Sequence, residues 1–301
     1  MALISRRNFV KSAAACAAML QASELFASPL GLPAGLQLYS VRDVLPNDYE
    51  GTLRKLASIG YRQVEAAGFF GHSAADVKQA MARAGLDCVS AHYSMGQLQK
   101  QAEEIIQFGN GVGLRYIVCS SPMQPNPAKA KGKNWVQSIE SMSREDWKWN
   151  ADQLNQIGKK TKAAGIQMGY HNHFLEFHQH DGFMGYDILL HETDPHLVTM
   201  EMDCGWVVVG GQRPEHYFER YPTRYSMLHL KEFKLEGWKP GTEPVPTEMG
   251  RGSIDYTKIF AAAKKYNVPI RHIFIEQEGY PDMPEMQALK VDADWIESFP
   301  G

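Results

Sequence analysis

The stretch GIQMGYHNHFLEF, residues 165–177, decides the fold of this chain. Gly165 ends a helix-like segment. The strand-like run that follows, residues 166–172, contains His171 near its end, and His173 and Glu176 lie just beyond it. Before it, residues 143–165 have a serine at the start, acids in the first turn and lysines in the last turns, which is typical of a capped helix. A helix followed by a buried strand that ends in polar side chains is the repeating unit of a parallel α/β protein.

The same unit recurs along the chain. Strands are expected at residues 35–40, 61–66, 86–93, 114–120, 166–172, 197–203, 225–231 and 271–278. Helices are expected between them, with Ser73 and Ser143 as N-caps and Gly60, Gly85 and Gly165 as stops. Eight alternations predict an α/β fold of the (β/α)8 TIM barrel type, in a single domain. An open doubly wound sheet is the alternative, but no G-x-G-x-x-G follows any strand.

Two segments are too long to be simple connections. Residues 121–142 and 232–254 each follow an expected strand, so both lie at the C-terminal face, where barrel enzymes build their sites. We expect them to form a lid or a wall of the substrate site.

The first 28 residues differ from the rest. SRRNFVK, residues 5–11, precedes an alanine-rich, weakly apolar segment, which predicts a twin-arginine export signal over residues 1–28, a barrel over 29–301 and a periplasmic location. A basic amphipathic helix and a lipid-attached form through Cys16 are the alternatives.

The composition excludes several classes of partner. The formal charge of −3 becomes −5 once residues 1–28, with three basic and one acidic side chain, are removed, so no general attraction to nucleic acid is expected. No apolar run approaches the ~20 residues of a membrane span. The remaining cysteines, Cys88, Cys119 and Cys204, lie in apolar runs and are expected to be buried thiols. A small sugar is the expected partner, and a homo-oligomer is left open.

Potential metal ligands are concentrated in the second half of the expected barrel. Four consecutive strands end in Glu/His, Asp, His and Glu, and polar residues at these ends point into the pocket of a barrel. Carboxylates with one imidazole suit Mn²⁺, Mg²⁺, Co²⁺ or Zn²⁺, of which Mn²⁺ is our first expectation. Without a cation, such carboxylates would repel one another. Glu201, two residues before Asp203, is expected inside the barrel with a partner.

Several motifs are similar to those of a known family. GIQMGYHNHFLEF, EMDCGW, LHLKEF, GRGSIDY and FIEQE resemble the xylose-isomerase-like barrel superfamily, over about residues 35–299. That group includes sugar isomerases and epimerases, inosose dehydratases, 3-keto-glycoside lyases and an abasic-site endonuclease branch. The resemblance implies a metal held by Asp203, His229 and Glu276. Relatives often carry glutamate on the fifth strand, where this chain has His171. We expect Glu176 to reach back as the fourth ligand, with His171 as the alternative.

Other side chains are assigned by their position in this pocket. His173 is the expected catalytic base, because it is surplus to the metal ligands, and His171 is a further catalytic candidate if it does not bind the metal. Lys231 is an acid or oxyanion partner or else a rim ion pair. Gln37, His92, Trp206 and Arg251 are candidate substrate-binding residues, although core packing explains many tryptophans and a turn explains Arg251. His178 and His180 are expected in a solvated loop.

The expected reaction begins with proton abstraction beside a carbonyl, with a divalent ion stabilising the enediolate. A metal-dependent sugar isomerase or epimerase is the first prediction. A lyase or hydratase acting on 3-keto-glycosides or inosose-like substrates is the alternative, and export favours it. An abasic-site endonuclease and a non-catalytic sugar-binding barrel rank below both.

Overall fold

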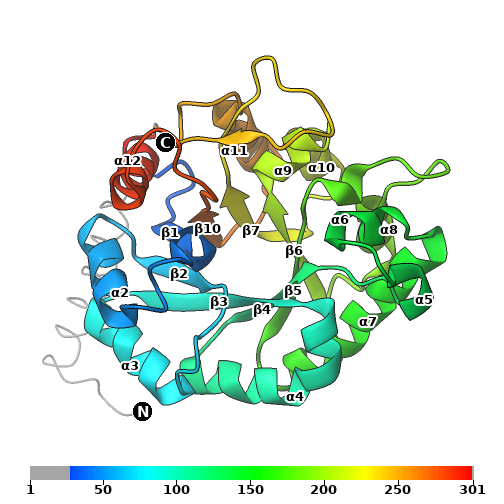
Figure 1. Cartoon of the computed structure of the whole chain (residues 1–301), viewed down its shortest axis with the longest axis horizontal. Coiled ribbons are helices and arrows are strands. Elements are labelled where there is room, and N and C mark those ends of the chain that lie inside the picture. The colour runs from blue at the N-terminus through cyan, green and yellow to red at the C-terminus, as the bar shows by residue number, and fades with distance from the viewer. Residues whose placement is uncertain (1–27, 300–301) are drawn as a thin grey trace, which may run out of the picture.

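Eight parallel strands close into a barrel in the computed structural model, which describes residues 28–299. Around the barrel the order is β1, β10, β7, β6, β5, β4, β3 and β2, so each strand lies beside its neighbours in the chain (Figure 1). The strands are β1 Ala34–Gln37, β2 Gln63–Ala66, β3 Asp87–Ser94, β4 Tyr116–Ser121, β5 Gln167–His171, β6 Val198–Asp203, β7 Tyr225–Leu230 and β10 His272–Ile275. The predicted single-domain TIM barrel is confirmed, whereas the predicted export signal lies almost wholly outside the described residues.

Helices connect the strands on the outside of the barrel (Figure 1). They are η1 Leu38–Val41, α2 Tyr49–Ser58, α3 Ala74–Ala84, α4 Met95–Val112, α5 Pro127–Ala130, α6 Trp135–Glu140, α7 Arg144–Ala163, η2 Leu175–Phe177, α8 Gly185–Glu192, α9 Cys204–Val209, α10 Pro214–Arg220, α11 Tyr256–Lys265 and α12 Glu285–Ser298. Ser73 and Ser143 cap α3 and α7 as predicted, because each hydroxyl accepts a backbone N–H of the first turn.

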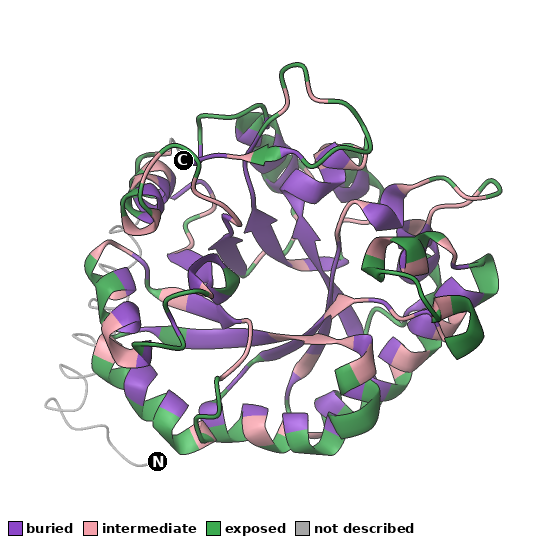
Figure 2. Ribbon diagram, viewed as in Figure 1, coloured by how far each residue is buried: buried purple, intermediate pink, exposed green. Residues whose placement is uncertain are grey.

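The core has two layers. A large apolar cluster fills the space between the strands and the helices, and the longer helices turn their buried sides toward the barrel (Figure 2). A second cluster consists of Val89, Tyr116, Val118, Met227 and Phe274. Met227 and Phe274 precede His229 and Glu276 by two residues, so they share the same side of their strands. This cluster therefore fills the barrel interior beneath the polar side chains at the strand ends.

The two long segments carry small elements of their own. Residues 121–142 contain α5 and α6, while residues 232–254 contain an antiparallel pair, β8 Phe233–Lys234 and β9 Val245–Pro246. Both stand at the C-terminal end of the barrel, as predicted, because they follow β4 and β7 directly.

Two strands end three residues earlier than predicted. β1 ends at Gln37, whose side chain accepts the N–H of Tyr39 and turns the chain into η1. β10 ends at Ile275, so Glu276 and Glu278 belong to the connection that follows it. The three cysteines in the described part of the chain are buried and unpaired, as predicted. Between residues 28 and 299, no helix is both long enough and apolar enough to cross a membrane.

Candidate metal centre

Four buried side chains converge at the ends of adjacent strands. His171 ends β5, Asp203 ends β6, His229 lies in β7, and Glu276 follows β10; each offers one ligand atom, and these atoms all lie within 4.8 Å of one another. Asp203 uses Oδ1 to accept the N–H of Trp206 at 2.8 Å and so begins α9. Its Oδ2 is buried and has no hydrogen-bond partner. A buried carboxylate oxygen without a hydrogen bond is free to bind a cation, and two carboxylates with two imidazoles are ligands that divalent metals accept, so the group fits a divalent metal.

One glycine allows the chain after Asp203 to approach β7 closely. Gly205 follows Asp203, and a Cβ there would lie 2.5 Å from the backbone oxygen of Lys231 and 2.9 Å from its Cβ. Any larger residue would push α9 away from β7. The glycine in EMDCGW therefore keeps Asp203 beside the β7 side chains.

Lys231 supplies a positive charge within this group. Its side chain is 1% exposed, and its Nζ lies 2.9 Å from Glu276 and 3.5 Å from Asp203, with a further ion pair to Glu278. Burial alone would lower the pKa of Lys231, but the three carboxylates outweigh burial and raise it. Lys231 is therefore a fixed cation and not a general base. Its ammonium also lies 4.9 Å from the ring of Trp206.

The carboxylates differ in how well their charge is compensated. Burial and the nearby Glu276 raise the pKa of Asp203 to about 6, although Lys231 and His229 oppose the shift. For Glu276, Lys231 and His229 overcome the effect of burial and lower the pKa. The charge of Asp203 is thus less well compensated than that of Glu276, because Lys231 lies 3.5 Å from Asp203 but 2.9 Å from Glu276.

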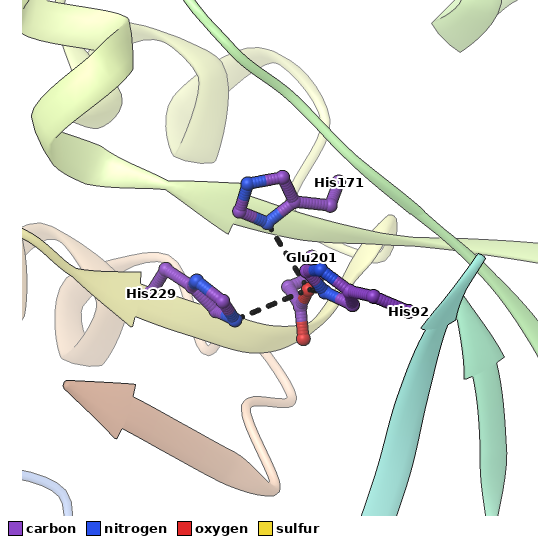
Figure 3. Close-up of side chains that lie close together, drawn as sticks. All are labelled: His92, His171, Glu201 and His229. Carbon is purple, nitrogen blue, oxygen red and sulfur yellow. Dashed lines mark hydrogen bonds and ion pairs between the residues drawn. The ribbon is translucent and has the colours of Figure 1, made fainter. Parts of the chain in front are cut away.

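A second polar layer lies beside the first. Figure 3 shows the imidazoles of His92, His171 and His229 converging on the carboxylate of Glu201, which is fully buried. The Oε2 atom of Glu201 lies 2.8 Å from His92 Nε2, 3.1 Å from His171 Nδ1 and 3.3 Å from His229 Nε2. Glu65 from β2 joins this layer, at 2.9 Å from His92 and 2.6 Å from His229. Glu201 therefore has the buried partners expected of it.

Glu176 lies apart from both layers. Its carboxylate accepts a hydrogen bond of 2.8 Å from the hydroxyl of Tyr170, on the outward-facing side of β5, and it belongs to neither group of potential ligands. Burial raises the pKa of Glu176 to about 7. The position expected for Glu176 is filled in the group by His171, the alternative ligand of the sequence.

A cavity of about 820 Å³ opens above these residues. Its floor is formed by the polar side chains His92, His171, His173, Glu276 and Glu278. The Nδ1 of His173 is buried without a hydrogen-bond partner, and burial lowers the pKa of this imidazole to about 3, so it is neutral. Lys231 is not among the lining residues and lies behind Glu276 and Glu278.

The upper wall of the cavity is aromatic. Trp135 comes from α6, Trp206 from α9 and Trp238 from the segment after β8, so both long segments contribute to the wall as predicted. His178 also lines the cavity, and its Nδ1 lies 3.6 Å from the carboxylate of Glu140 on α6. Sequence reasoning placed His178 in a solvated loop. Only the spacing HNHFLEFH, which returns to histidine just after a short turn, could have suggested otherwise.

The sequence pattern of the xylose isomerase-like TIM barrel family matches residues 53–299, which is most of the chain and includes the four-residue group. The chain belongs to the xylose isomerase-like TIM barrel family.

Other members and solved structures agree with this assignment. The inosose dehydratase of Clostridium perfringens is 24% identical over 257 residues, covering 78% of this chain and 84% of the dehydratase. A sugar phosphate isomerase/epimerase of Parabacteroides distasonis superposes with a TM-score of 0.73 at 24% identity, covering 89% of this chain and 99% of that one. The IOLI protein, which holds a zinc atom, superposes with a TM-score of 0.67 at 12% identity, covering 90% and 99%. At these identities the structural likenesses show the fold alone.

In this member of the family, the candidate substrate-binding residues are not all in the cavity. His92 and Trp206 line it. Gln37 is fully buried and donates a hydrogen bond of 2.9 Å to Glu65, so it contacts a neighbouring side chain and not the cavity. Arg251 lies outside the cavity lining, half exposed, 3.5 Å from Glu248.

Proposed function

We propose that this chain is a divalent-metal-dependent lyase that eliminates a leaving group from the carbon two positions away from a carbonyl in a cyclic keto sugar. The observation that carries the proposal is the buried group of His171, Asp203, His229 and Glu276 beneath a large cavity. A bound Mn²⁺, Mg²⁺, Co²⁺ or Zn²⁺ would polarise the substrate's carbonyl and acidify the neighbouring C–H bond.

The similar proteins favour elimination over isomerisation. The relative from Clostridium perfringens is a dehydratase, and dehydration of an inosose is an elimination. The isomerase or epimerase reaction, which the sequence placed first, begins with the same proton abstraction. The two reactions differ only in whether a carbon–oxygen bond then breaks. The isomerase therefore remains the second candidate.

The size of the cavity favours a substrate with more than one ring. A polar floor and a separate aromatic wall lie within one space of about 820 Å³, at the large end of the range for small-molecule sites. The floor suits the hydroxyl and carbonyl groups of a keto sugar. Trp135 and Trp238 offer apolar faces on which a second ring can stack. A 3-keto-glycoside fills both regions, whereas an inosose fills only the floor.

His173 is our proposed proton carrier. Its imidazole is neutral and lines the cavity. In the elimination, the unprotonated ring nitrogen of His173 takes the proton beside the carbonyl, and the electrons of the broken C–H bond form a C=C bond. These electrons then expel the leaving oxygen, which receives the proton from His173. The products are an unsaturated ketone and an alcohol, or water for an inosose, so the reaction needs no outside acid.

The test is to supply a 3-keto-glycoside, an inosose and a free ketose to the metal-loaded enzyme. We expect release of the aglycone and the absorbance of an unsaturated ketone, lost after chelation and restored by Mn²⁺. The free ketose should exchange its proton slowly or not at all. Conversion of the ketose without any carbon–oxygen cleavage in the other substrates would overturn the lyase and favour the isomerase.

We also propose export to the periplasm through residues 1–28, since paired Arg6 and Arg7 precede the alanine-rich segment. Cell fractionation of the full chain and of an Arg6→Lys, Arg7→Lys variant tests this proposal. The variant should stay in the cytoplasm. An unchanged distribution would exclude twin-arginine export.

A further inference from the structure

Both histidines of the proposed metal group have their second ring nitrogen against a buried carboxylate. Nδ1 of His171 lies 3.1 Å from Glu201, while its Nε2 lies 3.9 Å from Asp203. Nε2 of His229 lies 2.6 Å from Glu65, while its Nδ1 lies 3.1 Å from Glu276. Glu201 and Glu65 are both 0% exposed, and each contacts the other ring nitrogen from the one that faces Asp203 or Glu276.

These contacts, together with the place of the metal, decide which nitrogen carries a hydrogen. A bound metal would lie among His171, Asp203, His229 and Glu276, so the nitrogens that face Asp203 and Glu276 would carry no hydrogen, and the nitrogens that face Glu201 and Glu65 would donate N–H groups to these acceptors. A histidine that binds a metal keeps one nitrogen free for it and donates the other N–H. His171 then faces the metal through Nε2, and His229 faces it through Nδ1. The two ligands are held in opposite tautomers.

The orienting carboxylates are themselves held in place. The Nε2 of His92 lies 2.9 Å from Glu65 and 2.8 Å from Glu201, so one N–H is shared between them. Gln37 donates a further hydrogen bond of 2.9 Å to Glu65. Each carboxylate therefore has at least two donors, which restricts the positions that its oxygens can take.

We propose that Glu201 and Glu65 are positioning residues that fix the opposite tautomers of His171 and His229 and so set the affinity of the metal site. The proposal rests on the metal group of the proposed function but not on the reaction. It also explains why Glu201 lies with three imidazoles without being a ligand. The competing possibility is a second ion held by His92, His171, Glu201 and His229, whose ligand atoms also lie within 4.8 Å of one another.

The first test measures metal affinity and stoichiometry without substrate. Glu201→Gln and Glu65→Gln keep an oxygen acceptor but remove the charge, and we expect Mn²⁺ to bind about 10- to 100-fold more weakly. The matched control is Asp292→Asn, a buried carboxylate on α12 that accepts the N–H of Met249 at 2.7 Å; its affinity should equal that of the wild type. Thermal unfolding of the metal-free variants separates a loss of affinity from a loss of folding.

The outcomes are distinct. One ion per chain in the wild type, bound more weakly by both glutamine variants, supports the proposal. Two ions in the wild type and one in Glu201→Gln would overturn it in favour of a second site. Equal affinity in the wild type and both variants would also overturn it, while leaving the proposed function intact. If Mn²⁺ does not bind to the wild type, the proposed metal centre is wrong as well.

The tautomers can be observed directly. Long-range ¹H–¹⁵N correlation spectra of the Zn²⁺-loaded protein report which ring nitrogen carries a hydrogen. We expect Nδ1–H for His171 and Nε2–H for His229. The same tautomer for both histidines, or the reverse assignment, would contradict the proposal even if the affinities changed as expected.

Discussion

The hydroxyl of Tyr170 donates a hydrogen bond of 2.8 Å to the carboxylate of Glu176, which is fully buried. This contact holds Glu176, the first acidic side chain after β5, away from the other carboxylates. His171, in the same strand, lies among them instead. The candidate site thus has a second imidazole where the sequence resemblance implied a glutamate.

The first prediction separates these two residues. His171→Ala should weaken Mn²⁺ binding at least about 100-fold, because it removes a ligand, whereas Glu176→Gln should leave the affinity unchanged. Isothermal titration of both variants checks this prediction. A large loss of affinity in Glu176→Gln with none in His171→Ala would restore Glu176 as the ligand.

The stability of the wild type and that of Glu176→Gln should depend differently on pH. The folded protein raises the pKa of Glu176 from its ordinary 4.5 to about 7, so folding favours the protonated carboxyl. That stability is present below pH 4.5 and is lost as the pH rises through 7. Between pH 5 and pH 8, the wild type should lose about 1–3 kcal/mol more than Glu176→Gln. Chemical unfolding at both pH values measures the difference. If the free energy of unfolding falls equally in the two proteins, the pKa of Glu176 is not raised by folding.

Metal binding should release protons. Coordinated atoms must be deprotonated, yet burial and Glu276 raise the pKa of Asp203 to about 6, while Glu201, Glu276 and Glu65 overcome burial and raise that of His229. We expect the affinity for Mn²⁺ to increase about tenfold per pH unit near neutrality, and more steeply below pH 6, where Asp203 also binds a proton. Titrations in buffers of different ionisation enthalpy count the protons. An affinity that stays constant from pH 5.5 to 8.5 would refute this coupling.

Lys231 should stabilise the metal-free site more than the loaded one. In Lys231→Met the buried carboxylates of Asp203 and Glu276 lose their fixed counter-charge, which costs about 3–5 kcal/mol. A bound cation replaces that charge, so Mn²⁺ should raise the unfolding temperature of the variant more than that of the wild type. The control is Lys234→Met, an exposed pair with Asp282, for which about 1 kcal/mol or less is expected. If Lys231→Met is destabilised equally with and without Mn²⁺, the lysine stabilises the protein through packing and not through its charge.

The aromatic wall should select substrates by size. Trp238→Ala should raise the KM for a 3-keto-glycoside with an aromatic aglycone about 5- to 10-fold, because the stacking face is lost. The KM for an inosose should not change, since that substrate occupies only the floor. Trp238→Phe should restore most of the loss. Equal changes in the KM of both substrates would instead indicate that Trp238 only maintains the shape of the cavity.

Much of the site follows from strand periodicity. Asp203, His229 and Glu276 were expected together because each falls at or just beyond the end of a buried strand, and parallel strands of a barrel end at one face. The barrel brings these three together as the sequence predicts. The choice between His171 and Glu176 could not be made in advance, since it depends on the η2 turn and on the hydroxyl of Tyr170.

The second polar layer, which contains Glu65, His92 and Glu201, was harder to predict. Glu65 meets His229 across 164 positions of sequence, and His92 meets Glu201 across 109. Such pairs exist only after the barrel closes and β2 and β3 face β6 and β7. In the sequence, Glu65 and His92 are single polar residues near the ends of expected strands, and periodicity alone cannot pair them. The same limit explains why Gln37 was expected to contact sugar rather than Glu65.

The most direct measurement of the central claim is anomalous diffraction from crystals of the full barrel grown with Mn²⁺. We expect one peak, contacted by Nε2 of His171, Oδ2 of Asp203, Nδ1 of His229 and a carboxylate oxygen of Glu276. A single peak between His92 and Glu201, or a peak that Glu176 contacts while His171 does not, would contradict the proposed metal centre.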